Sequence, residues 1–463
     1  MTPPTSSPSQ SAPAQPLAPP ASGYTPVPYE GPSFDEALAL RREHLNPGIF
    51  HLYSQPLMIV EGKGQYLYDK DGRQYLDAFG GIVTVSVGHS HPKVIGAQVE
   101  QLQKLQHTTT IYLHPNVGLY AKALADKFPG DLDVSYFTNS GSEANETAIL
   151  MARLFTGSET VIGLRNGYHG GTGTTMGLTA HGTWKFPAGP PQNAIHATPG
   201  YCYRCPFGLE YPSCNVKCAR DLDDKIQYET SGEIAAFIGE CIQGVGGVVI
   251  PPKEYFGIVY DTVRKYGGVC IADEVQGGFG RTGENFWAFE HWDVQPDLVS
   301  MAKGIANGAP LGAVTTRMEI AEQMKRRIHF NTYGGNPVSM AAAKATLEVI
   351  DEEGIQANAK AIGAHLKERF LEIQQRRALI GDVRGLGLMF GVELVKDRTT
   401  KEPAKAETAR LLELARERGL LLGKGGLWGN VLRIKPPMCL TKADADFIAD
   451  VVDEALGVIE GGG

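Results

Sequence analysis

Several features that would mark common binding classes are missing from this 463-residue sequence. No run of about 18 apolar residues occurs, so no segment is expected to span a membrane. The formal net charge is −8, which argues against nucleic-acid binding, because such surfaces carry an excess of lysine and arginine. The N-terminus has neither the charged-then-apolar form of a secretory signal nor the arginines of a mitochondrial presequence. The sequence therefore predicts a cytoplasmic protein without a membrane or nucleic-acid partner.

Cysteine is scarce and glycine is abundant, with 7 and 56 residues. The glycines follow no fixed period, which excludes a fibrous protein. Many of them stand where a strand is followed by a helix, as in α/β enzymes that bind phosphate groups. The chain is 42% hydrophobic and too long for one simple core, so we expect a large domain and a smaller one that share a cofactor cleft.

The N-terminal part of the chain changes character at residue 33. Residues 1–32 are Pro, Ser, Ala and Thr with almost no charge, and we expect a disordered tail, with a Pro-rich docking ligand as the alternative. Ser33 and Glu36 then have the spacing of a helix capping box. Three short strands joined by Lys-Gly and Asp-Gly turns follow, so residues 33–85 are predicted to form the N-terminal segment of the smaller domain.

The rest of the chain falls into two parts. Over residues 86–339 strands and helices alternate, which is typical of a mostly parallel sheet with helices on both faces, and we assign this range to the large domain. Over residues 340–463 long helices alternate with the stretches RGLGLMFGVEL and VLRIKPP, which fits an α+β C-terminal part of the smaller domain.

A candidate anion site lies in the stretch YFTNSGSEANE. Ser140, Gly141 and Ser142 follow a predicted strand and begin a predicted helix, where free N–H groups and the helix dipole bind anions. The plain alternative is that Ser142 only caps the helix. Further on, Tyr168 and His169 precede a pair of glycines, and Tyr168 could stack on a planar cofactor or simply pack in the core.

An acid and a lysine occupy settings that suit cofactor chemistry. Asp273 ends the buried run VCIAD, and a carboxylate at the carboxyl end of a parallel strand points into the ligand crevice. Lys303, in SMAKG, has small and apolar neighbours, and burial lowers the pKa of an amine so that it can form a Schiff base. Pyridoxal phosphate needs such a lysine, an acid at its ring nitrogen and an anion site for its phosphate.

Taken together, the stretches NSGSEANE, YHG, IADEVQGGFGRTG, MAKG and TYGGNP resemble the class III, or subgroup II, pyridoxal-phosphate aminotransferases. The resemblance covers residues 34–458. It implies fold type I, with a large domain around a mostly parallel seven-stranded sheet and a smaller α+β domain. It also implies a ping-pong transfer of an amino group from an amino acid to a 2-oxo acid of the pyruvate or glyoxylate class.

The resemblance assigns roles to residues around the cofactor ring. Lys303 resembles the Schiff-base lysine, and Asp273 resembles the partner of the ring nitrogen. Val275 and Tyr168 resemble the residues packed on the two faces of the ring. Gln276 is similar to the donor to the ring's 3-oxygen.

The resemblance also assigns the phosphate ligands and an assembly. Ser140, Gly141 and Ser142 resemble the phosphate site within the chain. Thr332, in TYGGNP, is similar to a phosphate ligand that the other subunit supplies. The resemblance therefore implies a homodimer with shared active sites, with a tetramer as a further option.

Glu240 and Arg433 resemble an oppositely charged gate near the substrate. The sequence departs from the family twice in this region. Cys241 follows the glutamate where many members have proline, which puts the stiffness of this loop in doubt. Gly171 follows the His-Gly pair where members acting on ornithine derivatives or 4-aminobutyrate commonly have arginine, so the chain is most similar to the alanine–glyoxylate aminotransferase 2 branch.

Four of the cysteines lie in one short stretch. Cys202, Cys205, Cys214 and Cys218 have the spacing C-x2-C-x8-C-x3-C, which is compatible with a structural zinc or iron–sulfur site. Free thiols are the alternative, and disulfides are disfavoured in a cytosolic protein. The other three cysteines have apolar or strand surroundings and are expected to be buried.

Three readings of the function stay open at this point. The first is the aminotransferase, including one that acts on ω-amino acids. The second is an amino-acid racemase or epimerase, which would use the same Lys303 and return the proton to the α-carbon. The third is a binding or regulatory protein on a catalytically dead scaffold, against which Lys303 and Asp273 argue because both are intact.

Overall fold

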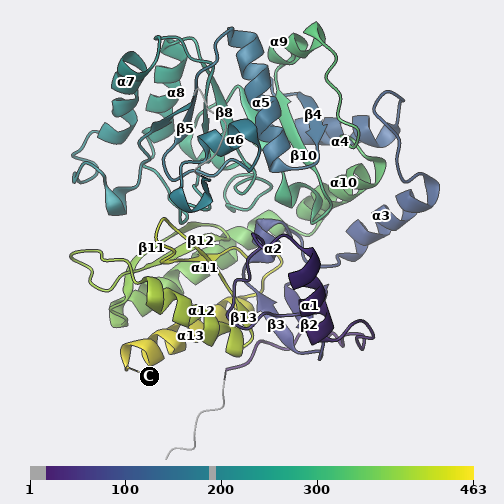
Figure 1. Ribbon diagram of the computed structural model, residues 1–463, viewed down its shortest axis with the longest axis vertical. Coiled ribbons are helices and arrows are strands. Elements are labelled where there is room, and N and C mark those ends of the chain that lie inside the picture. Colours follow the sequence, from purple (N-terminus) through teal and green to yellow (C-terminus); the bar gives the residue numbers. More distant parts are fainter. Residues whose placement is uncertain (1–16, 187–193, 463) are drawn as a thin grey trace, which may run out of the picture.

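A computed structural model of the protein describes residues 17–186 and 194–462 (Figure 1). The chain forms a larger body around one seven-stranded sheet and a smaller body around two four-stranded sheets. In Figure 1 the larger body stands above the smaller one, where the purple N-terminal segments lie beside the yellow C-terminal helices.

The sheet of the larger body has the strand order β4-β10-β9-β8-β7-β5-β6. Only β10 runs antiparallel to its neighbours, so the predicted mostly parallel sheet is confirmed. The strands β6, β9 and β10 were not identified from the sequence, because short buried runs lack the alternation that marks a strand. The strands are β4 (Val134–Thr138), β5 (Val161–Leu164), β6 (Ala194–Ala197), β7 (Ala236–Gly239), β8 (Val269–Asp273), β9 (Leu298–Met301) and β10 (Gly312–Thr316).

Helices cover both faces of this sheet. Along β7, Phe237 packs into the core cluster that contains α8 side chains, whereas the next residue, Ile238, packs into the cluster beneath α5. This alternation follows from the two-residue period of a strand, and it buries the sheet on both sides. The helices of this body are α3 (Pro92–Lys104), α4 (Pro115–Ala125), α5 (Gly141–Thr156), α6 (Gly173–Leu178), α7 (Lys217–Glu229), α8 (Tyr255–Lys265), α9 (Met318–Ala321) and α10 (Pro337–Glu352).

The smaller body combines the two ends of the chain. Leu420 pairs in parallel with Leu76, so β13 extends the N-terminal hairpin sheet. The first sheet has the order β1-β2-β3-β13 and the second β11-β12-β15-β14. The strands are β1 (Ile59–Lys63), β2 (Tyr66–Asp69), β3 (Gln74–Asp77), β11 (Ile380–Leu386), β12 (Met389–Leu394), β13 (Leu420–Leu421), β14 (Gly423–Gly425) and β15 (Val431–Ile434). The helices are α1 (Phe34–His44), α2 (Gly80–Val83), α11 (Ile355–Arg376), α12 (Lys405–Glu417) and α13 (Lys442–Glu460).

The capping box expected at the start of α1 is present, because the Ser33 hydroxyl accepts from the Glu36 N–H and Glu36 accepts from the Ser33 N–H. The segment before it differs from the predicted disordered tail over residues 17–32. This segment has no helix or strand, yet Tyr24 packs against the core, and the Gln74 side chain donates to the Pro20 carbonyl at 2.7 Å. Burial of two side chains, Leu17 and Tyr24, against the core thus offsets the ordering entropy on which the prediction of disorder rested. Residues 1–16 of the predicted tail lie outside the described residues.

None of the helices in the described ranges combines the length and the apolar character needed to cross a membrane.

Candidate active site

Asp273 ends β8, a central strand of the large sheet, and its side chain is buried. Its Oδ2 atom accepts from Asn145 Nδ2 at 2.9 Å and lies 2.8 Å from His169 Nδ1. Asn145 is itself held, because its amide oxygen accepts from the Ser300 hydroxyl on β9. The carboxylate is therefore fixed by residues from α5, the loop after β5 and the next strand, as expected for a group that must keep one orientation.

His169 responds to this carboxylate. Burial by itself lowers the pKa of the imidazole, but the hydrogen bond and the charge of Asp273 outweigh burial, so the pKa of His169 is raised above its ordinary value. The sequence pointed to His169 only as the neighbour of Tyr168 and did not indicate Asn145 or Ser300. The signal for Asn145 was a polar residue on the alanine-rich buried face of the EANETA helix.

Lys303 follows β9 and begins a short 3₁₀ turn, Lys303–Ala306. Its backbone φ of 49° lies in the left-handed region, which costs energy for a non-glycine residue and is common at functional sites. Burial lowers the pKa of its amine to about 8; the charge of Asp273 opposes the shift and that of Arg433 adds to it. A lysine with this pKa carries a much larger neutral, nucleophilic fraction at neutral pH than an exposed lysine.

The predicted anion site lies at the first turn of α5. Ser140 is the N-cap, and its hydroxyl accepts from the Glu143 N–H at 3.2 Å, so the alternative in which Ser142 caps the helix is wrong. The Ser142 hydroxyl instead accepts from the Gly171 N–H at 3.2 Å. Across the described part of the chain, the N–H groups of Gly141 and Ser142 have no hydrogen-bond acceptor. Such free N–H groups at a helix start are a site for a phosphate.

Gly141 also lets Val275 come close. A Cβ atom at position 141 would lie 3.2 Å from both methyl groups of Val275. The structure therefore brings the phosphate turn, the residue predicted for one ring face and the strand end of Asp273 together. Tyr168, predicted for the other face, packs edge-on against Trp184 with 5.2 Å between ring centroids, and burial raises the pKa of its hydroxyl.

Gln276 is buried, and its amide orientation is set by two basic side chains. The Oε1 atom accepts from Lys435 Nζ at 2.8 Å and from Arg433 Nη2 at 3.3 Å. This leaves the amide N–H groups as the free donors, which is the role predicted for Gln276. No sequence motif pointed to Lys435, and burial holds the pKa of its amine well below the ordinary value.

Glu240 and Arg433 lie near the same centre but make separate contacts. Glu240 accepts from the Tyr168 N–H at 3.0 Å and the Gly244 N–H at 2.7 Å, and burial, followed by the charge of Asp273, raises the pKa of its carboxyl. Arg433 stacks on the Phe79 ring at 5.3 Å, and burial lowers the pKa of its guanidinium to about 10. No ion pair joins the two among the described residues, so the paired gate stays a prediction.

Thr332 is exposed in the single chain, in the turn after Asn331. The Asn331 side chain accepts from the Gly334 N–H at 2.9 Å and from Asn139 Nδ2 at 2.9 Å. The turn is therefore tied to the residue before the phosphate site. Its predicted contact with a second chain stays a prediction.

The four-cysteine stretch gathers round one small cavity, where Cys202, Cys205, Cys214 and Cys218 are all free thiols. Among the described residues, no group of three or more His, Cys, Asp or Glu side chains is placed to hold a metal ion, so the predicted zinc or iron–sulfur site has no support. Burial raises the pKa of Cys218 to about 12, which disfavours the thiolate that a metal would need. Cys241 and Cys270 are buried, as predicted, whereas Cys439 is only partly buried.

Comparison with known proteins places these residues in a family context. A family model for class III aminotransferases matches residues 51–456. The chain is 52% identical over 438 residues to an Arabidopsis thaliana protein named alanine–glyoxylate aminotransferase 2 homolog 2, mitochondrial, covering 94% of this chain and 90% of that one. It is 40% identical over 467 residues to human alanine–glyoxylate aminotransferase 2, mitochondrial, covering 96% and 90%. A solved amine transaminase from an uncultivated Pseudomonas species, in its PLP-bound form, has a TM-score of 0.83 at 33% identity, covering 87% and 95%.

Proposed function

The chain belongs to the class III aminotransferase family, and we propose that Lys303 and Asp273 hold its pyridoxal phosphate. The protein has the fold-type I architecture and is an enzyme that moves an amino group between an amino acid and a 2-oxo acid. The observation that carries the residue assignment is the buried Asp273 at the end of β8, whose charge acts on a lysine with a pKa of about 8.

The described residues fit this cofactor on three counts. The free N–H groups of Gly141 and Ser142 suit its phosphate, the fixed carboxylate of Asp273 suits its ring nitrogen, and the free amide N–H groups of Gln276 suit its 3-oxygen. Val275 and Tyr168 would flank the ring. When bound, pyridoxal phosphate supplies an electron sink that stabilises negative charge on the substrate's α-carbon.

The side chains around the cofactor would have distinct roles. Asp273 would hold the ring nitrogen of the cofactor, and His169 and Asn145 keep the Asp273 carboxylate in place. The amine of Lys303 would hold the cofactor, and when free it would remove the proton from the substrate's α-carbon without returning it there. A racemase would return that proton to the α-carbon instead.

For the substrates we propose alanine as the amino donor and glyoxylate as the acceptor, with pyruvate as the acceptor for other donors. The names of the two relatives and the glycine at position 171, where ω-amino-acid enzymes of the family commonly have arginine, support this choice. Arg433 would bind the substrate carboxylate, and Glu240 would tune how that guanidinium is held.

A panel of amino donors assayed against glyoxylate and against pyruvate tests the substrates. We expect the highest kcat/KM with alanine and glyoxylate. A higher value for 4-aminobutyrate or another ω-amino acid would contradict the assignment. In a second arm the enzyme is incubated with L-alanine and no oxo acid, and formation of D-alanine at a catalytic rate would establish the racemase instead.

We also propose that the enzyme is a homodimer with shared sites, and a tetramer of such dimers is the alternative. Support comes from apolar side chains that the single chain leaves exposed around Thr332: Ile111 is 71% exposed and Ile328 99%. The stretches 106–111 and 328–336 contact each other, because Asn336 Nδ2 donates to the Gln106 carbonyl at 3.2 Å. Large exposed apolar patches of this kind mark protein interfaces.

Light scattering on a sizing column measures the assembly, and hybrid dimers test the sharing of sites. In a hybrid of a Lys303→Ala chain and a Thr332→Ala chain, sharing across the interface gives one site with both residues intact and one with both lost. Activity at limiting cofactor should then be about half of wild type. If Thr332 serves its own chain, every hybrid site keeps one lesion and no such recovery occurs. The Thr332→Ala homodimer is the control and should be impaired, since a hydrogen bond to a charged group contributes about 1.5–3 kcal/mol.

The compartment is a further proposal. The seven cysteines are all free thiols, which fits a reducing compartment, and we propose the cytoplasm. The relatives are named as mitochondrial proteins, so the mitochondrial matrix is the alternative. Fractionation of cells that express the full chain decides between the two.

A further inference from the structure

Arg433 is the residue proposed to bind the substrate carboxylate, and its guanidinium group makes few polar contacts. The side chain is buried, at 4% exposure. Among the described residues the guanidinium donates one hydrogen bond, from Nη2 to Gln276 Oε1 at 3.3 Å. A single long hydrogen bond leaves a guanidinium free to turn on its flexible stem, so its direction depends on the other groups against which it packs.

Phe79 supplies a second contact. The guanidinium carbon of Arg433 lies 5.3 Å from the centroid of the Phe79 ring, which is within the range of a cation–π interaction. An aromatic face restrains a guanidinium without using any of its N–H donors. Phe79 and Gln276 together therefore fix the group and leave most of its donors for a ligand.

Two glycines of β14 make room for this pair. A Cβ atom at Gly423 would lie 2.2 Å from Cε2 of Phe79, and a Cβ atom at Gly425 would lie 2.5 Å from Cδ of Arg433. Both separations are far shorter than a van der Waals contact, so a side chain at either position would displace the ring or the stem. The Phe79 ring and the Arg433 stem thus lie directly against the backbone of β14.

A strained turn sets the position of Phe79. Asp77 is buried, and its Oδ1 atom accepts from the N–H groups of Phe79 and Gly80 at 2.9 and 2.8 Å. The four residues of α2 that follow, 80–83, have left-handed φ values of 59°, 57°, 62° and 64°, and the last two are β-branched. Such residues avoid this region, and backbone strain of this kind is concentrated at functional sites.

The same turn reaches the second group that fixes Arg433. In Figure 1, α2 lies where the smaller body faces the larger one. Val83, its last residue, donates its N–H to the Phe79 carbonyl at 3.0 Å and lines a small cavity together with Gln276. The strained turn therefore connects Phe79 to the surroundings of Gln276.

We propose that Phe79 is a positioning residue, which holds Arg433 in the direction that binds the α-carboxylate of the amino acid and of the 2-oxo acid. The inference rests on the proposed function, in which Arg433 binds that carboxylate. Alanine and glyoxylate both carry the carboxylate on the carbon that reacts, so one fixed guanidinium serves both halves of the reaction. A fixed guanidinium also disfavours amines without a carboxylate, because they leave it buried without an acceptor.

The test follows the half-reaction of holoenzyme with L-alanine and no oxo acid, by the change in the visible absorbance of the cofactor. Phe79→Leu removes the aromatic face and keeps an apolar side chain. We expect the alanine concentration at half-maximal rate to rise about 2- to 30-fold, the range of a cation–π contact, and the maximal rate to stay within about threefold. An unchanged half-saturating concentration would overturn the proposal. If another L-amino acid is the better donor, it replaces alanine, since both carry the carboxylate.

Hydroxylamine distinguishes positioning of Arg433 from a general disturbance of the site. It attacks the aldehyde carbon of the cofactor but has no carboxylate, so its rate should stay within about twofold in Phe79→Leu. A loss of this rate equal to the loss for alanine would show that Phe79 supports the cofactor itself, and would refute the role.

Two further variants guard against effects on folding. Phe370→Leu is the matched control, because Phe370 is buried and packs on Phe390 in the smaller body. It should lower stability and leave the half-saturating concentration of alanine unchanged, and an equal rise there would refute the proposal. Gly423→Ala displaces the Phe79 ring without removing it, so it should raise the half-saturating concentration even if Phe79→Leu folds poorly.

Arg433→Gln separates failure of this inference from failure of the proposed function. If Arg433 binds the carboxylate, this variant raises the half-saturating concentration of alanine about tenfold or more, and Phe79→Leu adds nothing in the same background. An unchanged value in Arg433→Gln refutes the proposed role of Arg433 and the inference with it. A large effect of Arg433→Gln with none from Phe79→Leu, or additive losses in the double variant, refutes the inference alone.

Discussion

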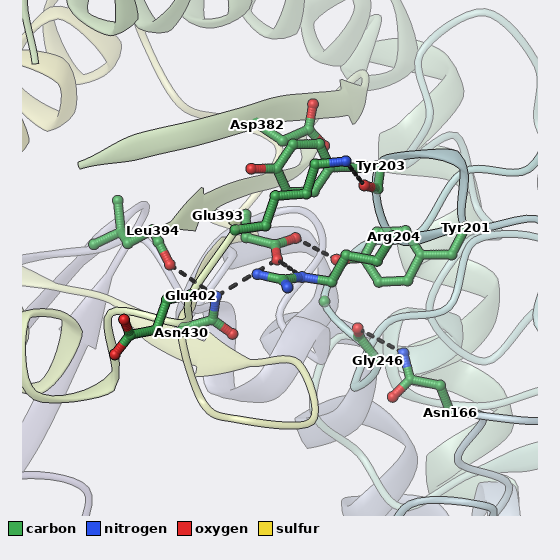
Figure 2. Close-up of polar contacts among 12 residues, drawn as sticks. Asn166, Tyr201, Tyr203, Arg204, Gly246, Asp382, Glu393, Leu394, Glu402 and Asn430 are labelled. Atoms are coloured by element: carbon green, nitrogen blue, oxygen red, sulfur yellow. Dashed lines mark hydrogen bonds and ion pairs between the residues drawn. The ribbon is translucent and has the colours of Figure 1, made fainter. Parts of the chain in front are cut away.

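The reaction centre and the cavity around Glu393 are both polar sites between packed elements, but they are built in opposite ways. At the reaction centre the charge of the Asp273 carboxylate acts on Lys303. The carboxylate itself is held by an uncharged and a weakly basic group, Asn145 and His169. The other cavity lies between the two bodies and is lined by Tyr201, Arg204 and Asn430. Its central carboxylate, Glu393, forms ion pairs with two arginines and accepts a hydrogen bond from a tyrosine (Figure 2). The Asp273 carboxylate is thus left available for chemistry, whereas the Glu393 carboxylate is fully engaged in structural contacts.

The difference is visible in the titration of the two sites. Burial with little compensation lowers the pKa of Lys303 to about 8. At Glu393 burial raises the pKa of the carboxyl, but the charge of Arg384 and the bonds from Tyr201 and Arg204 outweigh burial and lower it below its ordinary value. Substitutions at the first site should therefore change turnover, and those at the second should change stability.

The largest effect on turnover is expected for Lys303→Ala. Without the amine there is no attachment point for the cofactor and no proton carrier, so we expect no measurable turnover and loss of the visible absorbance of the attached cofactor. Circular dichroism should show an intact fold. Residual turnover above a small percentage of wild type would move the catalytic role to another residue.

The next largest effect is expected for Asp273→Asn, with Glu274→Gln as its matched control. The amide cannot keep the ring nitrogen protonated, so kcat at saturating cofactor should fall about 10²- to 10³-fold. Glu274 is also buried, and among the residues that the structure describes it accepts only from the N–H groups of Ala288 and Phe289, at 3.0 and 2.8 Å. Its substitution should cost about 1–3 kcal/mol of stability and leave kcat within a few-fold.

The control also has its own pH signature. Burial raises the pKa of Glu274 to about 8 from an ordinary value of 4.5. The folded state therefore binds more protons than the unfolded state between these values, and stability falls as pH rises from about 4.5 to 8. Denaturant unfolding of wild type and Glu274→Gln across this range should show that decline only in the wild type. Equal pH dependence in both would place the titration elsewhere.

The contrast also explains what the sequence could predict. Asp273, Val275 and Gln276 are adjacent in the chain, and the strand that precedes them fixes which way each points, so one short motif contains most of the ring contacts. The partners of the motif are different. Lys435 reaches Gln276 across 159 residues, and that pairing depends on how the two bodies pack.

The residues around the Glu393 cavity could not be predicted in this way. Its polar groups come from stretches around residues 166, 204, 393 and 430, and the motifs in the first two, YHG and the C-x2-C spacing, gave no sign that Asn166 and Arg204 lie side by side with Glu393 and Asn430 at one cavity. The fold was more predictable than either site, because strands and helices follow local periodicity. The exceptions were the short buried strands and the segment 17–32, where two apolar side chains outweigh a Pro-rich composition.

A smaller effect, on cofactor affinity, is expected for Lys435→Met, which tests whether positioning through Gln276 matters. Removal of the donor at 2.8 Å frees the Gln276 amide to rotate, and cofactor affinity should fall about tenfold, as for the loss of one hydrogen bond. In a Gln276→Leu background the same substitution should add almost nothing. Additive losses in the double variant would mean that Lys435 acts on its own, not through the glutamine.

The smallest effect on turnover is expected for Glu393→Gln, where the comparison predicts the largest effect on stability. The amide leaves Arg204 and Arg384 without their shared countercharge, and breaking a buried pair in this way costs about 3–5 kcal/mol.

The pKa of Glu393 is lower in the folded state than in the unfolded state, so its stabilisation is complete above about pH 4.5 and is lost as pH falls through the folded value. The free energy of unfolding of the wild type, monitored by fluorescence, should therefore fall as the pH is lowered below about 4.5. Glu393→Gln should lack this part of the pH dependence. Turnover of the folded fraction at saturating substrate should stay within about threefold of wild type, because no atom of Glu393 lines the reaction centre. A large fall in kcat with unchanged stability would show that the Glu393 cavity takes part in the reaction itself, and that the two sites are one.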